Sequence, residues 1–367
     1  MTDEGIFLAR PEAPREGIAL AVKDLFDTAE LVTTYGSVVF ADHVPERTAE
    51  AVTRLEEAGY ANLGKTNLHE FAYGVTSQNP HYGTVPNPTA PGRIAGGSSG
   101  GSAAALAAGL ADTALGTDSG GSIRIPAACC GVVGLKPTYG LVPLDGCFPL
   151  APTFDPAGPM ARSVEDCARM MESLVPGFEQ QSPGTPAAGI AWTEHAHPLV
   201  ADRVREVGAG LDARPVDFPF ARGTYPMFMQ EVADVHRDLF AEHADAYGDN
   251  VRAKIERCLE VTDAQVETAH EAREAYRRAA DAALEGLDLL LTPTLPIVPP
   301  PADVEELEVR EILTRFTYPF NVLGWPVLTL PAGTAEDGLP ASVQLIGRPG
   351  DDALLLAVGA SLERGTP

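Results

Sequence analysis

The chain has 367 residues, 45% of them hydrophobic, which is enough to build a sizeable core in one large α/β domain or two average ones. It carries 51 acidic against 26 basic residues, a formal net charge of −25. Such an acidic surface repels phosphate, so the composition argues against an extended nucleic-acid interface and predicts no nucleic-acid partner.

The cysteines and the hydropathy pattern bear on the compartment. Five cysteines, an odd number, do not fit the disulfide framework of a secreted scaffold. No charged-then-apolar leader and no apolar run long enough to cross a bilayer is visible. We therefore expect reduced cysteines, no membrane partner and a cytoplasmic location.

The first predicted element is a strand that ends at a lysine. Residues 1–16 are polar and contain two prolines, which indicates a loose N-terminal arm before a single domain over residues 17–367. The apolar run Ile18–Val22 is typical of a buried strand, and Lys23 stands at its carboxyl end. Open α/β sheets place their chemistry at that end of their strands.

A phosphate-loop pattern follows, but in the wrong structural order. The spacing predicts a helix over Glu46–Ala58 that stops at Gly59, and then a strand over Tyr60–Leu63. Residues 59–66 match GxxxxGK[ST], a motif that requires a strand before it and a helix after it. We therefore favour a structural role for Lys65 over nucleotide binding.

Two glycine-serine clusters dominate the centre of the chain. GGSSGG (residues 96–101) and SGGS (119–122) flank the run Ser102–Leu110, which predicts a short buried helix. Glycine lets the backbone approach a ligand closely, and serine offers a hydroxyl. The second cluster follows the strand-like run Thr113–Gly116, so its amides can converge on one pocket and stabilise an oxyanion. These features are typical of acyl transfer.

The first cluster also fits the GxSxG nucleophile elbow, with Ser99 as the nucleophile. An elbow requires its own strand before it, and an acid and then a histidine after it. The preceding residues 87–92 are turn-like, and no histidine is an obvious partner. We rank this mechanism second.

The second half of the chain alternates helices and strands. Ser163 predicts a helix start, with Glu165 and Asp166 in the first turn. Within the helical region, Glu231, Asp234 and His236 lie on a solvated helix, and we predict no metal site there. The other expected elements are two or three amphipathic helices over 225–286, strands over Leu289–Leu291, Pro326–Pro331 and Ala341–Ile346, and a closing helix over Asp351–Leu362.

The central stretch resembles the signature of the amidase signature family, serine hydrolases that use a Ser-cisSer-Lys triad. Ser122 matches the family's nucleophile, Ser98 the bridging serine that follows a cis peptide bond, and Lys23 the catalytic lysine. Further segments that resemble family landmarks are 64–67, 134–138 and 344–349, so the resemblance covers nearly the whole chain.

The resemblance implies a fold, an activity and a set of site residues. The expected fold is α/β, a three-layer α/β/α arrangement with a central mixed, largely parallel twisted sheet, in which helices of 225–286 cover part of the pocket. The expected activity is an amidase that forms a Ser122 acyl-enzyme without a cofactor or metal. The other site residues it implies are the oxyanion amides of Ser119, Gly120, Gly121 and Ser122, the substrate contacts Tyr73, Gly74 and Ser98, and the supporting residues Asp118, Arg124 and Ser99.

The substrate is the open point. In the glutamine-using amidotransferase branch of the family, an acidic residue precedes the segment matched here by Thr317–Asn321, where this chain has Thr314 and Arg315. We therefore favour a small carboxamide, aryl amide or carbamate, with Phe316 and Trp325 beside Tyr73 in the pocket. The alternatives are an amidotransferase A-type subunit that works with partner subunits, and a non-catalytic binding subunit. The chain could also form a homodimer.

Overall fold

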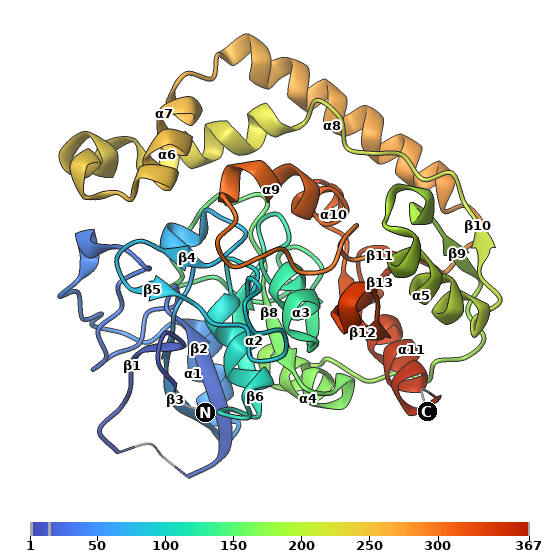
Figure 1. Ribbon diagram of the computed structural model, residues 1–367, viewed down its shortest axis with the longest axis horizontal. Helices are drawn as coiled ribbons and strands as arrows, with labels where there is room; N and C mark the ends of the chain where they lie inside the picture. Colours follow the sequence, from blue (N-terminus) through green and yellow to red (C-terminus); the bar gives the residue numbers. More distant parts are fainter. Residues whose placement is uncertain (1–2, 14–15, 366–367) are drawn as a thin grey trace.

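A computed structural model describes residues 3–13 and 16–365, and its core is one mixed sheet between layers of helices (Figure 1). The strand order is β1-β3-β2-β6-β8-β7-β12-β13-β11-β9-β10. Parallel pairs form the flanks β3-β2-β6 and β11-β9-β10. The strands are β1 (Phe7–Ala9), β2 (Ile18–Lys23), β3 (Tyr60–Thr66), β6 (Thr113–Thr117), β7 (Val133–Lys136), β8 (Ala157–Ala161), β9 (Ala188–Ile190), β10 (Arg214–Pro215), β11 (Leu289–Pro293), β12 (Val327–Thr334) and β13 (Pro340–Ile346), with β4 (Gln78–Asn79) and β5 (Gly83–Thr84) in a separate hairpin.

The predicted three-layer α/β fold with a mixed sheet is confirmed, and its centre is antiparallel. Strand β8 inserts between β6 and β7 and runs against both, and β12 and β13 continue the antiparallel pairing as far as β11. "Largely parallel" therefore describes the flanks and not the middle. The sequence could not show this, because a fully buried strand is an unbroken apolar run that carries no record of its direction.

The N-terminal segment is partly built into the sheet, which corrects the expectation of a loose arm. Strand β1 pairs antiparallel with β3, with Phe7 opposite Thr66. Ile6 is buried, and its carbonyl accepts a hydrogen bond from the Asn67 amide at 2.8 Å. Residues 1–2 and 14–15 of the predicted arm lie outside the described residues.

Helices cover both faces of the sheet. Helices α1 (Glu50–Glu57), α4 (Val164–Leu174) and α11 (Asp352–Gly365) share one hydrophobic cluster, which Val204 of α5 (Pro198–Ala209) joins. Helices α2 (Gly100–Ala107) and α3 (Arg124–Cys130) pack in another cluster. Helix α2 is buried on all sides, and a Cβ at Gly101 would lie 2.3 Å from the Asn67 carbonyl oxygen, so small residues are required there.

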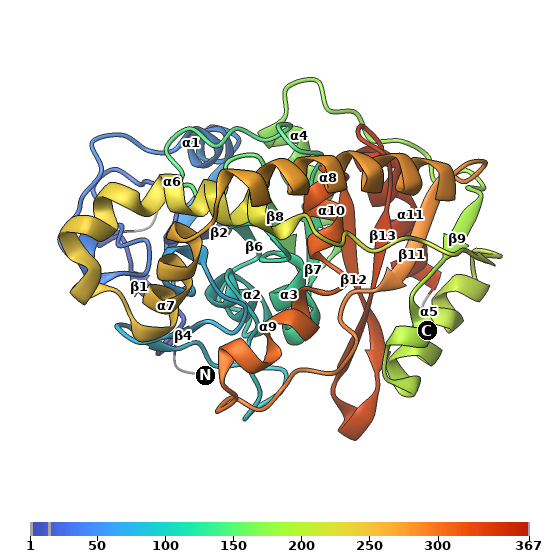
Figure 2. The same cartoon turned by 90° about the horizontal axis from the view of Figure 1, so that it is seen from above.

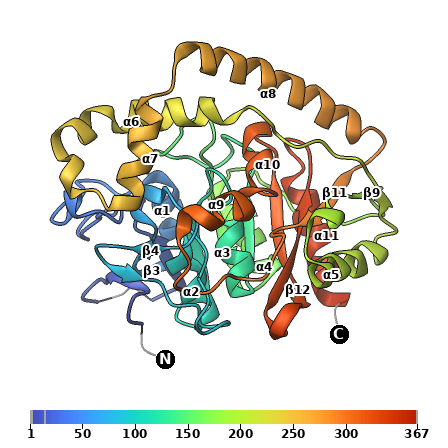
Figure 3. The same cartoon turned by 45° about the horizontal axis from the view of Figure 1, so that its top comes forward.

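A helical cover lies over one side of this body. Helices α6 (Tyr225–His243), α7 (Asp249–Leu259) and α8 (Asp263–Ala283) cross the top of the molecule in Figure 1, and Figure 2 shows α6 and α8 running lengthwise over it. Beneath them lie α9 (Glu306–Thr314) and α10 (Tyr318–Leu323) (Figure 3). The amphipathic helices predicted for 225–286 are thus present.

Five short 3₁₀ segments stand among the described residues, and the cysteines and lysines are mostly buried. The 3₁₀ segments are Val38–Phe40, Glu70–Ala72, Thr193–His195, Ala244–Ala246 and Glu336–Gly338. All five cysteines are free. No helix within residues 3–13 and 16–365 is both long and apolar enough to cross a membrane. All four lysines, Lys23, Lys65, Lys136 and Lys254, are buried.

Candidate active site

Lys23 is buried at the end of β2, where it meets two hydroxyl groups. The side-chain amine lies 2.7 Å from Ser98 Oγ and 2.7 Å from Thr117 Oγ1, and the residue has no solvent exposure. Burial lowers the pKa of Lys23 from 10.5 to about 7, although Asp118 and Asp155 act to raise it. A large fraction of this amine is therefore neutral near pH 7 and able to accept a proton.

Ser98 is fixed by the backbone around it. The Gly97–Ser98 peptide bond is cis. The Ser98 carbonyl accepts hydrogen bonds from the His69 amide and the Ser77 hydroxyl, each at 3.2 Å. A Cβ on Gly97 would lie 2.9 Å from the Ser77 amide nitrogen, so the close approach of these two segments requires glycine.

The two serine clusters are joined through Ser99. Its amide donates to the Ser122 carbonyl at 3.1 Å, and its hydroxyl donates to the Thr117 carbonyl at 3.2 Å. Ser122 itself is 6% exposed and stands just before α3. Because the Ser99 hydroxyl is buried and bonded to Thr117, it is not presented to a substrate, which argues against the elbow hypothesis. Ser99 instead holds the cluster of Ser98 against that of Ser122.

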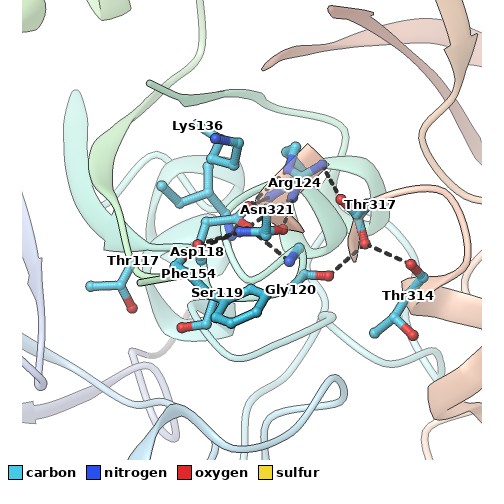
Figure 4. A network of polar contacts seen from close by, with 12 residues as sticks. Thr117, Asp118, Ser119, Gly120, Arg124, Lys136, Phe154, Thr314, Thr317 and Asn321 are labelled. Atoms are coloured by element: carbon cyan, nitrogen blue, oxygen red, sulfur yellow. Dashed lines mark hydrogen bonds and ion pairs between the residues drawn. The ribbon is translucent and has the colours of Figure 1, made fainter. Parts of the chain in front are cut away.

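Asp118 organises the loop before Ser122. Its carboxylate accepts the Gly121 amide at 2.8 Å and the Ile123 amide at 3.1 Å, and it forms a two-pronged ion pair with Arg124 at 2.8 and 3.0 Å (Figure 4). Burial alone would raise the pKa of the Asp118 carboxyl, but the Arg124 guanidinium holds it well below its usual range. The support predicted for Asp118 and Arg124 is thus visible as contacts.

The structure corrects one of the four predicted oxyanion donors. The Gly121 amide points at Asp118, so it is not directed at a substrate oxygen. Gly121 has φ +132°, and a Cβ there would lie 2.3 Å from Thr317 Oγ1. Within the part of the chain that the structure describes, the amides of Ser119, Gly120 and Ser122 meet no acceptor. These three remain as candidate donors.

Residues far along the chain complete this loop, and the sequence analysis did not assign them to the site. The Thr317 hydroxyl donates to the Gly120 carbonyl at 2.7 Å, and Asn321 Nδ2 donates to the Asp118 carbonyl at 2.7 Å (Figure 4). Arg124 Nη2 donates to Asn321 Oδ1 at 2.6 Å. The sequence does mark the segment 317–321, because it matches a family segment. That match concerns the choice of substrate, and it does not predict the hydrogen bonds of Thr317 and Asn321 to the loop.

Asp155 is a second carboxylate that the sequence analysis missed. It accepts hydrogen bonds from the Ser119 hydroxyl and from the amides of Leu150 at 2.9 Å and Ala151 at 3.0 Å. Burial raises the pKa of Asp155 to about 6. A small cavity of about 140 Å³ lies beside it, lined in part by Thr117 and Ser119. Nothing in the turn-like sequence around Asp155 indicated these contacts.

A larger cavity of about 700 Å³ opens above the loop. Gly120 lies in its wall, and the other walls come from Tyr73, from the segment 220–223 and from helices α6, α7, α9 and α10. Residues of the 225–286 region therefore cover part of the cavity. Its volume suits a small-molecule ligand.

Some of the predicted pocket residues line the cavity, and others do not. Tyr73 lines the cavity, and so do Thr314 and Arg315. Gly74 is not in its wall, because it packs against the His69 ring, where an added Cβ would lie 2.2 Å from ring atoms. Phe316 and Trp325 were expected in the pocket, but both are buried in the hydrophobic core around Trp192 and Phe320.

Side-chain contacts bear on two other patterns of the sequence, the phosphate-loop match and the acidic and histidine residues of α6. Lys65 lies within β3, with its amine 3.4 Å from Asp24 Oδ1 and 2.9 Å from Thr33 Oγ1, which confirms a structural role. Glu231 binds the Thr153 amide, whereas His236 Nδ1 lies 3.0 Å from the Tyr247 hydroxyl, so these two face different partners. No group of three or more His, Cys, Asp or Glu that could hold a metal occurs among the described residues.

Known proteins resemble this chain over most of its length. The amidase family model matches residues 3–193 and 209–356. The glutamyl-tRNA(Gln) amidotransferase A subunit of Natronomonas pharaonis is 34% identical, with 96% of this chain and 96% of that protein covered. The AtzE subunit of 1-carboxybiuret hydrolase from Pseudomonas sp. (strain ADP) is 34% identical over 95% of this chain and 84% of its own length.

A crystal structure of an amidase superposes with a TM-score of 0.84 at 37% identity, over 96% of this chain and 85% of that one. The likeness to this amidase is therefore one of sequence as well as fold. The family model also covers both serine clusters and the strand that carries Lys23. The chain belongs to the amidase family, the amidase signature enzymes.

Proposed function

We propose that this protein is an amidase that cleaves its substrate through an acyl-enzyme on Ser122. The observation that carries the proposal is the buried Lys23 amine, which lies 2.7 Å from Ser98 Oγ and has a pKa of about 7. A neutral amine that meets a serine hydroxyl can accept the proton of that hydroxyl.

In the proposed first step, Ser122 Oγ attacks the carbonyl carbon of the amide. Its proton passes to Ser98, whose own proton passes to Lys23, so the lysine becomes an ammonium. The carbonyl oxygen becomes an oxyanion, which the amides of Ser119, Gly120 and Ser122 stabilise, each donor contributing about 3 kcal/mol.

In the second step, the tetrahedral intermediate collapses and the C–N bond breaks. Lys23 returns the proton through Ser98 to the leaving amine, and the acyl group remains on Ser122. Water then attacks this ester with the same relay as base, which releases the carboxylic acid and restores Ser122.

The substrate proposed from the sequence is a small carboxamide, aryl amide or carbamate. The cavity of about 700 Å³ accommodates such molecules, and the aromatic ring of Tyr73 lines it. The relative from Pseudomonas sp. belongs, by its name, to a hydrolase of 1-carboxybiuret, which is compatible with this class.

The test is hydrolysis of an amide panel by the wild type and by Ser122→Ala and Lys23→Met. We expect each variant to lose at least about 10³-fold in kcat/KM. A fluorophosphonate should label the wild type but not Ser122→Ala. The control is Ser173→Ala, because Ser173 lies in α4, outside the candidate site, and its hydroxyl contacts the Arg169 carbonyl and Tyr60. Near-normal hydrolysis by Ser122→Ala or Lys23→Met would refute the proposal.

An amidotransferase A-type subunit is the second candidate, favoured by the 34% identity to the Natronomonas pharaonis protein. Thr314 and Arg315 speak against it, because they line the cavity where that branch has an acidic residue for the amino group of glutamine. A glutaminase assay decides between the two, since glutamine as the best substrate of the panel would support the amidotransferase. A non-catalytic subunit would show no labelling and no hydrolysis.

A further inference from the structure

The large cavity is lined by positive charge, although the protein as a whole is strongly acidic. Of its described lining residues, five are basic, namely Arg222, Lys254, Arg257, Arg310 and Arg315, and only Glu311 is acidic. In the whole chain the ratio is reversed, with 26 basic against 51 acidic residues. A cluster of one sign inside a cleft raises the local concentration of ligands of the opposite sign.

On the inner wall of the cavity one carboxylate contacts two basic side chains, and burial lowers the pKa of one of them, Lys254, to about 7. Glu306 lies 3.3 Å from the Lys254 amine and 3.2 Å from Arg310 Nη1, and it also accepts the Val75 amide. The attraction of Lys254 and Arg310 holds the pKa of Glu306 well below its usual range in spite of burial. Arg310 thus shares its carboxylate partner with Lys254, and its guanidinium continues toward the cavity.

Arg310 is also held in a fixed orientation. Its guanidinium lies 4.9 Å from the centre of the Tyr73 ring, and Nη2 donates to the Tyr225 hydroxyl at 3.1 Å. The side chain is 19% exposed. An arginine that is packed on an aromatic ring and partly open to a cavity presents its remaining donors in a planar fork that matches a carboxylate.

The outer arginines of the cavity have no acidic partner. Among residues 3–13 and 16–365, Arg222, Arg257 and Arg315 form no ion pair, and Arg315 lies over the Phe220 ring at 5.7 Å. Elsewhere, several arginines on exposed helix faces pair with a carboxylate one turn away, as Arg205 does with Asp202 and Arg277 with Glu274. Three arginines of the cavity wall are therefore available to an anionic ligand.

We infer that the substrate of this enzyme carries a carboxylate, which Arg310 and Arg315 bind while the amide lies at Gly120 of the Ser122 loop. This inference rests on the proposed amidase function and narrows its substrate class. The rings of Tyr73 and Phe228 also line the cavity, so an aryl or short alkyl spacer fits between the two polar ends.

The first experiment compares matched substrates that differ only in the charge. Wild-type enzyme is assayed with 4-carbamoylbenzoate against 4-methylbenzamide, and with glutaramate against pentanamide. We expect kcat/KM to be at least tenfold higher for the carboxylate of one pair. This preference should shrink between 50 and 500 mM NaCl, because salt screens the attraction.

Variants then locate the effect. Arg315→Gln is the main variant, because Arg315 is exposed and its loss leaves no buried charge unpaired, and Arg310→Gln is the second. In each the charged-to-neutral ratio of kcat/KM should fall at least threefold. Arg47→Gln is the control, since Arg47 is an exposed arginine outside the cavity. A ratio that both variants leave unchanged would overturn the assignment of these arginines.

A binding measurement separates this inference from the catalytic proposal. Calorimetric titration of Ser122→Ala protein with the same two pairs reports affinity without turnover. If the carboxylate of a pair binds tighter but the wild type hydrolyses nothing, the anion site stands and the amidase proposal fails. If the wild type hydrolyses both members of each pair equally and neither carboxylate binds tighter, the amidase proposal stands and the anion site is wrong.

Discussion

If Lys23 is the base of the proposed relay, its buried amine gives the activity a pH dependence whose sign is fixed. Burial lowers the pKa of Lys23 from 10.5 to about 7, and only the neutral form can take the proton from Ser98. For a neutral amide substrate, kcat/KM should therefore fall about tenfold per pH unit below pH 7 and level off above it. Initial rates from pH 5 to 9 measure this, and a profile without any rise through pH 7 would contradict the assigned base.

Gly121 is the residue of the loop 118–122 that tolerates a side chain least. It has φ +132°, and an added Cβ would lie 2.3 Å from Thr317 Oγ1. Gly121→Ala should cost about 1–3 kcal/mol of stability through backbone strain, before any cost of the clash. Urea denaturation measures the loss.

Gly120→Ala is the matched control for that measurement. The nearest atom to a Cβ at Gly120 is Tyr318 Cδ2 at 3.8 Å, which is ordinary contact. Its unfolding free energy should stay within about 1 kcal/mol of the wild type. Equal stability of the two variants would mean that the neighbouring Thr317 can move aside.

Among single residues, those within sequence motifs could be predicted. Those that only the fold brings next to the site could not. Lys23 and Ser98 are in contact as expected. Asp155 and Asn321 reach the Ser122 loop from other parts of the chain, and Thr117 contacts Lys23. Residue type alone does not mark any of the three. The Gly121 amide was assigned wrongly because a motif does not show which way each N–H points.

The start of helix α4 is an element whose cap was predicted and can be measured. The Ser163 hydroxyl accepts the Asp166 amide at 3.2 Å, which satisfies one of the free amides of the first turn. Ser163→Ala should lower the free energy of unfolding by about 1 kcal/mol. The control is Ser173→Ala in the last turn of the same helix, where no such amide is free, and a loss there equal to that at Ser163 would refute the capping effect.

Elements were predicted well where the pattern is local. The predicted strand Ile18–Val22 and helices of 225–286 are present nearly at their expected bounds. Strand β1 was missed because three residues at a sheet edge carry too little pattern, and it forms only through pairing with β3. The order and direction of the central strands depend on tertiary packing and were not contained in any single segment.

On the scale of the whole molecule, the net charge of −25 opposes compaction. Repulsion among surface carboxylates destabilises the folded state, and salt screens it over a Debye length of about 10 Å at 0.1 M. We expect Tm to rise as NaCl increases from 0.05 to 1 M. Differential scanning calorimetry at pH 8 tests this, and a Tm that falls over that range would show that salt-sensitive ion pairs outweigh the repulsion.

The burial of all four lysines has a practical consequence. Arginine supplies the cations of the described surface, so a reagent that acylates primary amines finds no lysine target there while the chain is folded. Mass spectrometry of peptides after brief treatment with an N-hydroxysuccinimide ester would therefore record, lysine by lysine, how often each part of the interior opens. The four positions lie on β2, β3, β7 and α7, so the native sequence already carries reporters in both the sheet and its helical cover.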